Sequence, residues 1–277
     1  QNPFYKIVTE IITSISNPSV KELVKLRESA RRRRERRGFF VEGIEDLITM
    51  MASGKEVSEI YYNSRLAIHS GSMKDIERWK ESETHQLQEL GEDAFLKAAY
   101  RRNPDGVLGI VQSWDLGLSN LKCEDLTKPI LLFDEIEKPG NLGAIIRTSE
   151  ALGAGTIILS EPRVDFFNPN VVRSSRGLLA NVNLAVGEKG EILEYLEKFG
   201  LEFVATSARA EQCSHEFQYQ ANTVLVFGSE SKGLGEFWKR KIKQWIRLKM
   251  LGTASSLNLN VSLGCVLNDY NRINQKL

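Results

Sequence analysis

Apolar residues follow two different patterns along the chain, and the pattern changes near residues 114–128. In the first part, Val20, Leu23, Val24 and Leu26 fall on one face of a helix that runs into an arginine-rich stretch. The later apolar runs predict a strand at 38–41, a helix around 47–51 and strands at 60–62 and 107–111. The stretch 70–97 is polar and helical in character, and its pattern fixes no single element.

From residue 129 onward, short apolar strands alternate with helical segments. Strands are expected at 130–133, 156–159, 182–186, 203–205, 223–227 and 245–248. Such alternation is typical of a parallel sheet covered by helices. Sites in these sheets lie beyond the carboxyl ends of the strands, so the loops after Phe133, Ala205, Phe227 and Leu248 carry the candidate chemistry.

Composition and length lead to a two-domain prediction. The chain has 277 residues, of which 42% are hydrophobic and 26% charged, as in ordinary globular proteins. Residues 114–128 are polar and without periodicity, which is typical of a linker. We therefore expect an α/β protein with a smaller domain at 1–113, a linker at 114–128 and a parallel-sheet domain at 129–277.

Charge is concentrated in one place. The net charge is +1, yet the stretch from Lys21 to Arg37 holds nine Lys or Arg against three Glu, a local charge of +6. A basic block on a nearly neutral protein favours a localised contact with a polyanion such as RNA. Arg32, Arg33 and Arg36 are the candidate RNA-binding residues, and a solvated basic helix face is the alternative.

Several classes of function are not expected. There is no apolar run of 18 residues, so no membrane span is predicted, and the first residues do not read as a secretory signal. The odd number of distant cysteines (Cys123, Cys213 and Cys265) predicts reduced thiols and a cytoplasmic protein. We expect no metal site, because neither Cys-x-x-Cys nor His-Glu-x-x-His occurs, and the pair Cys213 and His215 is a weak alternative.

The loop after Phe133 enters a helix with the sequence PGNLGAIIRTSEALG, residues 139–153. On a helical wheel Arg147 lies apart from the apolar stripe, on a face of small residues where a ligand or another backbone can come close. Asn141 stands near the helix start, where a capping role is the alternative to a chemical one.

The other two loops are also unusual. In the glycine-rich loop Phe227–Gly235, Glu230 disfavours a bare phosphate and the order of Lys232 and Gly233 breaks the Walker pattern. Such a loop suits a ligand that is cationic or rich in donors, and an ordinary tight turn is the alternative. In the loop at 250–260, Ser255, Ser256 or Asn258 can cap the last helix, whose apolar stripe is a packing or dimer face. The stripe consists of Leu259, Leu263, Val266, Tyr270 and Ile273.

Taken together, the three loops carry an ordered set of motifs. These are Asn-x-Gly-x-x-x-Arg at 141–147, Phe-Gly-x-Glu-x-x-Gly at 227–233 and Met-x-Gly-x-x-x-Ser-Leu-Asn at 250–258. Residues 129–277 thereby closely resemble the SpoU-type (TrmH-like) RNA ribose methyltransferases of the trefoil-knot superfamily. The stretch VKELVKLRESARRRRERRGFFVEG at 20–43 resembles the opening of that family's substrate-binding domain, a module like a ribosomal protein, and the likeness is loose after Gly54.

The resemblance implies a function and a set of site residues. It implies methylation of a ribose 2′-hydroxyl in RNA with S-adenosylmethionine as cofactor, by a knotted homodimer that acts on large-subunit ribosomal RNA. The alternatives are a tRNA 2′-O-methyltransferase and a non-catalytic RNA-binding or ribosome-assembly protein. The implied catalytic and structural polar set is Asn141, Arg147, Glu230, Ser256 and Asn258, and the implied cofactor-binding residues are Thr206, Gly228, Leu248, Met250 and Leu257.

Three positions depart from the family pattern. Lys138 precedes Pro139 where the family usually has Asp, and Lys249 replaces the Pro expected before Met250. Asn260 stands where the family usually has Ser. None of these departures removes a matched catalytic residue, so the predicted function is unchanged.

Overall fold

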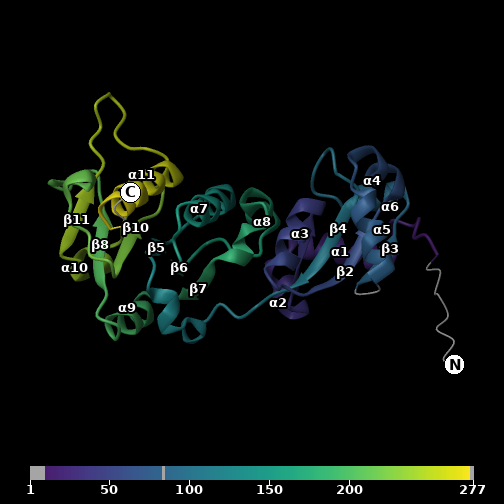
Figure 1. The fold of residues 1–277 in the computed structure, drawn as a ribbon, viewed down its shortest axis with the longest axis horizontal. Helices are drawn as coiled ribbons and strands as arrows, with labels where there is room; N and C mark the ends of the chain where they lie inside the picture. The colour runs from purple at the N-terminus through teal and green to yellow at the C-terminus, as the bar shows by residue number, and fades with distance from the viewer. Residues whose placement is uncertain (1–9, 83–84, 275–277) are drawn as a thin grey trace. The chain divides into compact units, whose positions relative to one another are not determined.

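The computed structural model describes residues 10–82 and 85–274, which form two compact units (Figure 1). The first unit contains the described residues up to Trp114 together with Phe167–Pro169. The second contains Asp115–Phe166 and the described residues from Asn170 onward. Each unit has its own sheet, so each builds its own core.

The first unit is built on a four-stranded sheet in the order β1-β4-β2-β3. β4 pairs antiparallel with β1 and β2, whereas β2 and β3 are parallel. The strands are β1 (Gly38–Glu42), β2 (Val57–Tyr62), β3 (Gln86–Glu89) and β4 (Val107–Gln112). The helices are α1 (Pro18–Glu28), α2 (Ala30–Arg36), α3 (Ile44–Ala52), α4 (Ser64–Ser70), α5 (Met73–Ser82) and α6 (Glu92–Ala98).

Local sequence explains how the first unit begins and packs. Asn17 caps α1 by accepting the Ser19 N–H, and Pro18 occupies the first helical position. The predicted apolar face of α1 is confirmed, since Val20, Leu23 and Leu26 are fully buried in a core shared with α6 and the sheet.

The stretch 70–97 contains a strand that the sequence pattern did not indicate. β3 has the sequence Gln-Leu-Gln-Glu and lies at the edge of the sheet, beside β2. An edge strand with polar side chains has no continuous apolar signal in the sequence. It is held in the sheet by backbone hydrogen bonds to its neighbour, which the side-chain pattern does not reveal.

The second unit is built on a seven-stranded sheet in the order β7-β6-β5-β10-β8-β11-β9, and every pairing within it is parallel. The predicted parallel sheet is therefore confirmed, and the two-residue edge strand β9 was not foreseen. The strands are β5 (Ile130–Asp134), β6 (Thr156–Ser160), β7 (Asn183–Gly187), β8 (Glu202–Thr206), β9 (Gln212–Cys213), β10 (Thr223–Phe227) and β11 (Gln244–Arg247).

Helices cover both faces of this sheet. In Figure 1, α7 and α11 lie together on one side of the strands and α9 lies on the other. Ile192, Leu196 and Trp238 pack with strand residues into one of the cores of this unit. The helices are α7 (Pro139–Ala151), α8 (Pro169–Ser175), α9 (Lys189–Glu197), α10 (Glu236–Lys241) and α11 (Leu259–Asn274).

Residues 115–128 lie against the second sheet. They form two short 3-10 turns, η1 (Leu118–Asn120) and η2 (Cys123–Leu126). Leu121 and Leu126 belong to the core of this unit, and Tyr195 donates its hydroxyl to the carbonyl of Leu121 at 2.7 Å. This segment is therefore part of a folded unit along much of its length.

Helix α7 begins as its sequence suggests but without the expected cap. Pro139 occupies the first turn, and Lys138 is the N-cap residue without a side-chain bond. The capping alternative for Asn141 is wrong, because this residue lies inside the helix. The small-residue face does permit close approach, since a Cβ on Gly143 would lie 2.4 Å from Cβ of Ser174 and 2.8 Å from the carbonyl of Val171.

Candidate active site

Four loops meet at one edge of the second sheet. They follow β5, β10, β8 and β11, which are consecutive neighbours in the sheet, so their carboxyl ends open at the same edge. Together with the start of α11 they enclose a cavity of about 760 Å³. The cavity is lined from Lys138 in the first loop to Val266 in α11.

Three side chains link the loops across this cavity. The side-chain amide of Asn141 donates to Oε1 of Glu230 at 2.8 Å, and the amide of Asn258 donates to Oδ1 of Asn141 at 3.4 Å. Oδ1 of Asn258 in turn accepts the N–H of Asn260 in the first turn of α11. Asn141, Glu230 and Asn258, one from each predicted motif, are thus brought into one hydrogen-bonded chain. Asn258 provides the cap of α11 that the sequence also allowed for Ser255 or Ser256.

The loop that carries Glu230 is a tight glycine turn. Ser229 and Gly233 exchange backbone hydrogen bonds, and Gly233 has a positive φ of 68°. A Cβ on Gly228 would lie 2.1 Å from the carbonyl carbon of Gly233, so glycine is required there. Among the described residues, Oε2 of Glu230 is buried and has no hydrogen-bond partner. A buried acceptor of this kind is costly unless a ligand donates to it.

The residues implied for the cofactor all line the same cavity. Thr206, Gly228, Leu248, Met250 and Leu257 are among its walls, as are Asn141, Glu230, Ser256 and Asn258.

Arg147 lies elsewhere on the chain. It is exposed and is not among the residues that line the cavity. It follows Asn141 by six residues on α7, a spacing that puts the two side chains on different faces of the helix. The chain by itself therefore separates Arg147 from the other members of the implied polar set.

Two carboxylates accept hydrogen bonds from the glycine-rich loop. Asp134 at the end of β5 is 1% exposed, and it accepts the hydroxyl of Ser160 at 3.0 Å and the N–H of Gly235 at 3.4 Å. Glu137 accepts the hydroxyl of Ser231 at 2.9 Å. Sequence reasoning missed both residues, although a charged residue directly after a buried strand was the signal that could have found them.

Lys189 neutralises the carboxylates near Asp134. Its Nζ lies 2.6 Å from Glu135, 3.1 Å from Glu161 and 3.5 Å from Asp134. Partial burial alone would lower the pKa of Lys189, but hydrogen bonds to Glu135 and Glu161 and the charge of Asp134 raise it above its usual value. The Lys189 hydrogen bond lowers the pKa of Glu135.

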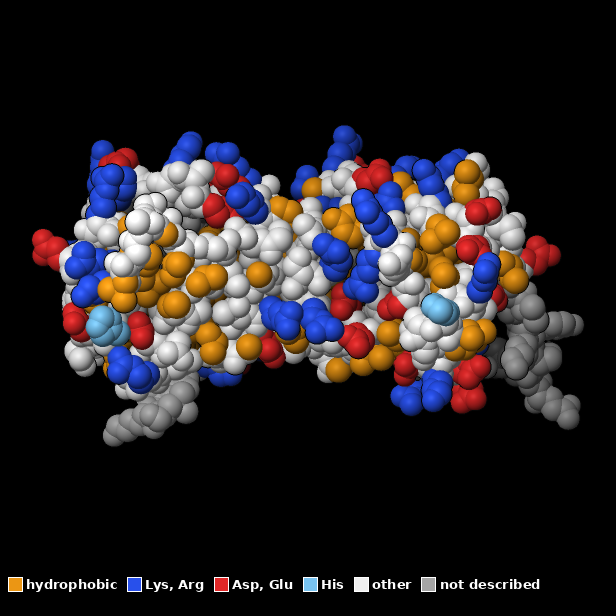
Figure 2. All heavy atoms as spheres, turned by 90° about the horizontal axis from the view of Figure 1, so that it is seen from above, with side chains coloured by type: hydrophobic (Ala, Val, Ile, Leu, Met, Phe, Trp, Pro, Cys, Tyr) orange, Lys and Arg blue, Asp and Glu red, His pale blue; other side chains and the backbone are white. Residues whose placement is uncertain are grey.

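The apolar stripe of α11 faces the interior. Leu263, Val266 and Tyr270 are at most 3% exposed, so the packing alternative for this stripe is confirmed. Three other apolar side chains are uncovered nearby: Leu251 is 90% exposed, Val261 48% and Leu257 40%. Figure 2 shows hydrophobic side chains gathered on the face of the second unit that it draws, at the left.

The three arginines predicted to bind RNA have different surroundings. Arg32 pairs with Glu22 at 2.9 Å and Arg36 with Glu59 at 2.7 Å, and both are partly exposed. Arg33 is only 4% exposed, and its Nη1 donates to the carbonyl of Leu26 at 2.8 Å and that of Arg27 at 3.4 Å. The prediction that Arg33 contacts RNA is wrong on this geometry, because the side chain caps the last carbonyls of α1 inside the unit.

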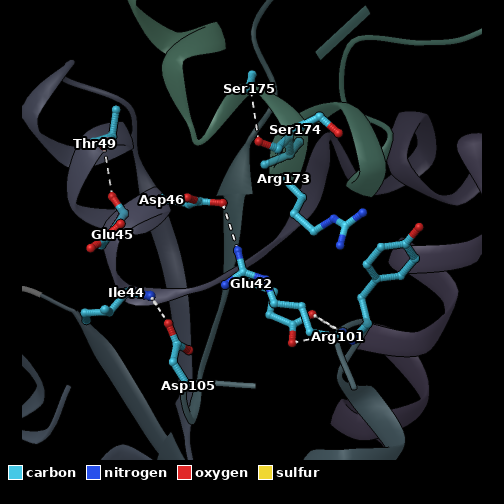
Figure 3. A network of polar contacts seen from close by, with 12 residues as sticks. Glu42, Ile44, Glu45, Asp46, Thr49, Arg101, Asp105, Arg173, Ser174 and Ser175 are labelled. Atoms are coloured by element: carbon cyan, nitrogen blue, oxygen red, sulfur yellow. Dashed lines mark hydrogen bonds and ion pairs between the residues drawn. The ribbon is translucent and has the colours of Figure 1, made fainter. Parts of the chain in front are cut away.

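A further polar network in the first unit has a structural explanation. Buried Glu42 accepts the N–H groups of Tyr100 at 2.7 Å and Arg101 at 3.0 Å (Figure 3). The Arg101 guanidinium lies 3.4 Å from Asp46, and Asp105 accepts the N–H of Ile44 at 2.8 Å. Burial raises the pKa of Glu42. These contacts fasten the start of α3 to the loop before β4.

Metal ligands, membrane spans and thiols can be assessed within residues 10–82 and 85–274. No group of His, Cys, Asp and Glu there has the arrangement of a metal site. No described helix is both long and apolar enough to cross a membrane. Cys213 is a buried free thiol and Cys265 an exposed one, whereas the side chain of Cys123 and the first nine residues lie outside the described part of the chain.

Comparison with known proteins gives matches to both units. Residues 128–268 match the model of the SpoU rRNA Methylase family, and residues 17–109 match the MRM3-like substrate binding domain. The uncharacterized tRNA/rRNA methyltransferase slr1673 of Synechocystis is 29% identical over 97% of this chain and 96% of its own length. A 23S rRNA (guanosine-2′-O-)-methyltransferase, RlmB of Pseudomonas putida, is 33% identical over 56% of this chain and 64% of its own length.

Solved structures resemble the whole chain as well. A crystal structure of an RNA 2′-O ribose methyltransferase is 28% identical, with a TM-score of 0.81 over 97% of this chain and 100% of that one. An AdoMet-bound rRNA methyltransferase from Sinorhizobium meliloti is 26% identical, with a TM-score of 0.83 over 95% and 98% of the two chains.

Proposed function

The chain belongs to the SpoU rRNA Methylase family and is an RNA methyltransferase, and from this premise we propose that it methylates a ribose 2′-hydroxyl of large-subunit ribosomal RNA. The methyl donor is S-adenosylmethionine, which is bound in the Sinorhizobium meliloti relative. Support for ribosomal RNA comes from the 23S rRNA activity named for the Pseudomonas putida relative. A tRNA substrate is the second candidate, because the Synechocystis relative is named for both RNAs.

One observation carries the proposal: the hydrogen-bonded chain of Asn141, Glu230 and Asn258 lies in the wall of a ligand-sized cavity. At about 760 Å³ the cavity falls in the usual range for a small-molecule site. The glycine turn at 228–233 brings backbone close to a ligand, and the buried Oε2 of Glu230 suits a donor-rich or cationic group. These features fit S-adenosylmethionine.

When bound, S-adenosylmethionine supplies a methyl group that its sulfonium has already activated. We propose that Thr206, Gly228, Leu248, Met250 and Leu257 hold it. The remaining task of the protein is to align the ribose hydroxyl and assist the loss of its proton. Asn141, Glu230 and Asn258 fix the loops that perform this alignment, with Ser256 beside them.

For Arg147 we propose contact with RNA. A guanidinium stays protonated and is a poor base, so Arg147 would bind the phosphate beside the target and hold the hydroxyl while the proton leaves to phosphate or water. Because Arg147 does not line the cavity of its own chain, this role requires a second copy to bring it to the reacting ribose.

We accordingly propose a homodimer. The uncovered side chains of Leu251, Leu257 and Val261 support it, since apolar groups gathered beside a site favour an interface. The trefoil knot and a cytoplasmic location, both drawn from the family resemblance and the sequence, complete the proposal. Sedimentation of the purified chain measures the oligomeric state, and a monomer at micromolar concentration would contradict the dimer.

The decisive test is methyl transfer from labelled S-adenosylmethionine. The substrates are ribosomal RNA and tRNA from cells that lack this protein, with Arg147→Ala as the control variant. We expect label on a ribose 2′-oxygen of large-subunit ribosomal RNA and its loss in the variant. Label on tRNA alone would replace the substrate, and no label on either RNA despite cofactor binding would favour a non-catalytic RNA-binding protein.

A further inference from the structure

Five cationic side chains line the cavity against a single carboxylate. Among the described residues, the lining cations are Lys138, Lys232, Lys239, Arg209 and Arg247, and Glu230 is the carboxylate. Four of these cations are exposed and Arg247 is partly exposed, so they stand at the mouth of the cavity rather than in its depth.

Four of the five cations form no ion pair with another described residue. Lys239 pairs with Glu236 at 2.7 Å. For Lys138, Lys232, Arg209 and Arg247, no ion pair is found anywhere in the described ranges, and Nε of Arg247 is buried without a hydrogen bond. We call these four side chains the cationic rim. Unpaired charges that converge on one opening raise the local concentration of a polyanion there.

The rim is wide enough for more than one anionic group. Lys138, Lys232 and Arg209 lie in the loops after β5, β10 and β8, and Arg247 is the last residue of β11. These are four neighbouring strands of the sheet. With a spacing of about 4.8 Å between strands, the row extends over roughly 14 Å. A single carboxylate, such as that of the cofactor, occupies only one point of such a row, whereas successive phosphates of a nucleic-acid strand can occupy several.

We propose that the cationic rim binds the backbone phosphates of the RNA strand on both sides of the target ribose. The inference rests on the proposed function, because it places the substrate strand across the mouth of the methyl-donor cavity. It adds a phosphate-binding surface on the second unit, made by residues outside the implied catalytic and cofactor sets. Phosphate contacts fix the register of a strand without reading its sequence, so the rim would orient the ribose for any target nucleotide.

The test is the double variant Lys138→Gln with Lys232→Gln in the full chain. Binding is measured by fluorescence anisotropy with a labelled single-stranded RNA of about twelve nucleotides over a series of salt concentrations. Each phosphate contact contributes about 0.7 to the slope of log affinity against log salt for single strands, so the slope should fall by about 1.4 and the affinity roughly tenfold near physiological salt.

The matched control is Lys241→Gln with Lys243→Gln. These lysines are also exposed and without ion pairs among the described residues, but neither lines the cavity, and Lys243 stands directly before the first residue of β11, whereas the cavity opens at the carboxyl ends of the strands. We expect an unchanged slope for this control. Affinity for S-adenosylmethionine, measured by calorimetry, should be equal in the wild type and both double variants.

The outcomes separate the two proposals. An unchanged salt slope in the rim variant, or an equal fall in the control, would overturn the rim while methyl transfer by the wild type still supports the proposed function. A fall in cofactor affinity that matches the fall in RNA affinity would assign these lysines to the cofactor and also overturn the rim. A reduced slope without methyl transfer to any RNA would support the rim and contradict the proposed function.

Discussion

Positive charge is concentrated in the basic segment from Lys21 to Arg37 and in the cationic rim of the cavity, and the two differ in how far their charges are paired within the protein. The segment is conspicuous in the sequence, yet Arg31, Arg32 and Arg36 pair with carboxylates and Arg33 is buried on carbonyls. The rim is scattered over more than a hundred residues of sequence, and its members form no ion pair within the part of the chain that the structure describes.

A run of charged residues in a sequence therefore overstates the charge that is available to a ligand. Helical neighbours at three and four residues neutralise each other, as Arg31 and Glu35 do at 2.7 Å. Loops that converge at a sheet edge collect charges that no sequence window contains.

The largest effect is expected at Glu230, the single carboxylate among the cations. Glu230→Ala removes the Asn141 hydrogen bond and frees the glycine loop, so kcat should fall about a hundredfold. Glu230→Gln keeps an oxygen that can accept from Asn141 and should lose less than tenfold. Single-turnover methylation measures both, and equal losses would mean that the negative charge, and not the positioning, is required.

Within the basic segment the largest effect concerns stability. Arg33→Met removes the cation that donates to the carbonyls of Leu26 and Arg27 at the end of α1, at a cost of about 2 kcal/mol. Urea unfolding measures the loss, with Arg34→Met, an exposed neighbour, as the control. Equal urea midpoints for both variants would show that the Arg33 hydrogen bonds do not stabilise the unit.

A smaller effect distinguishes paired from unpaired arginines on the same segment. Arg34 and Arg37 are exposed and have no ion pair among the described residues, unlike Arg32 and Arg36. Arg34→Gln with Arg37→Gln should reduce RNA affinity severalfold, and more than Arg32→Gln with Arg36→Gln does. Anisotropy titrations decide the order, and the reverse order would show that RNA displaces the carboxylates.

The smallest expected effect is on the pH dependence of stability, through Glu135 in the loop after β5. Because the pKa of Glu135 is lowered in the folded state, its contribution to stability is present above the ordinary value of 4.5 and is lost as the pH falls through the lower folded value. Glu135→Gln should therefore flatten the loss of stability below pH 4.5, by less than about 1 kcal/mol. Thermal midpoints between pH 3 and 7 measure it, and parallel curves would refute the assignment.

The sequence predicted the fold best where a short apolar run forms a single strand. β5 and β10 were predicted because each is a run of apolar residues with β-branched members, and the parallel sheet then predicted that the loops after them would meet. The strands β3 and β9 were missed because β3 is mostly polar and β9 has only two residues, so neither contains an apolar run.

The sequence singled out Asn141, Glu230 and Asn258, which the fold brings together, but it did not predict their contacts. Asn141 was weighed as a cap, whereas its partner Glu230 comes from a loop that only the fold brings near. The burial of Arg33 depends on how α2 turns back on the end of α1, which helical periodicity does not describe. The support from Asp134 and Glu137 was missed because their partners, Gly235 and Ser231, belong to a segment far along the chain.

The order of strands in the second sheet also determines when the cavity can exist. Ile130 of β5 pairs with Val224 of β10, and the last wall of the cavity is Val266 in α11. During synthesis β5, β6 and β7 are the first strands of this sheet to leave the ribosome, and one side of β5 stays unpaired until β10 follows. If this cavity holds the methyl donor as proposed, the nascent chain can bind it only after α11 has joined the sheet, because closing a sheet with distant contacts is slow and α11 supplies part of the wall.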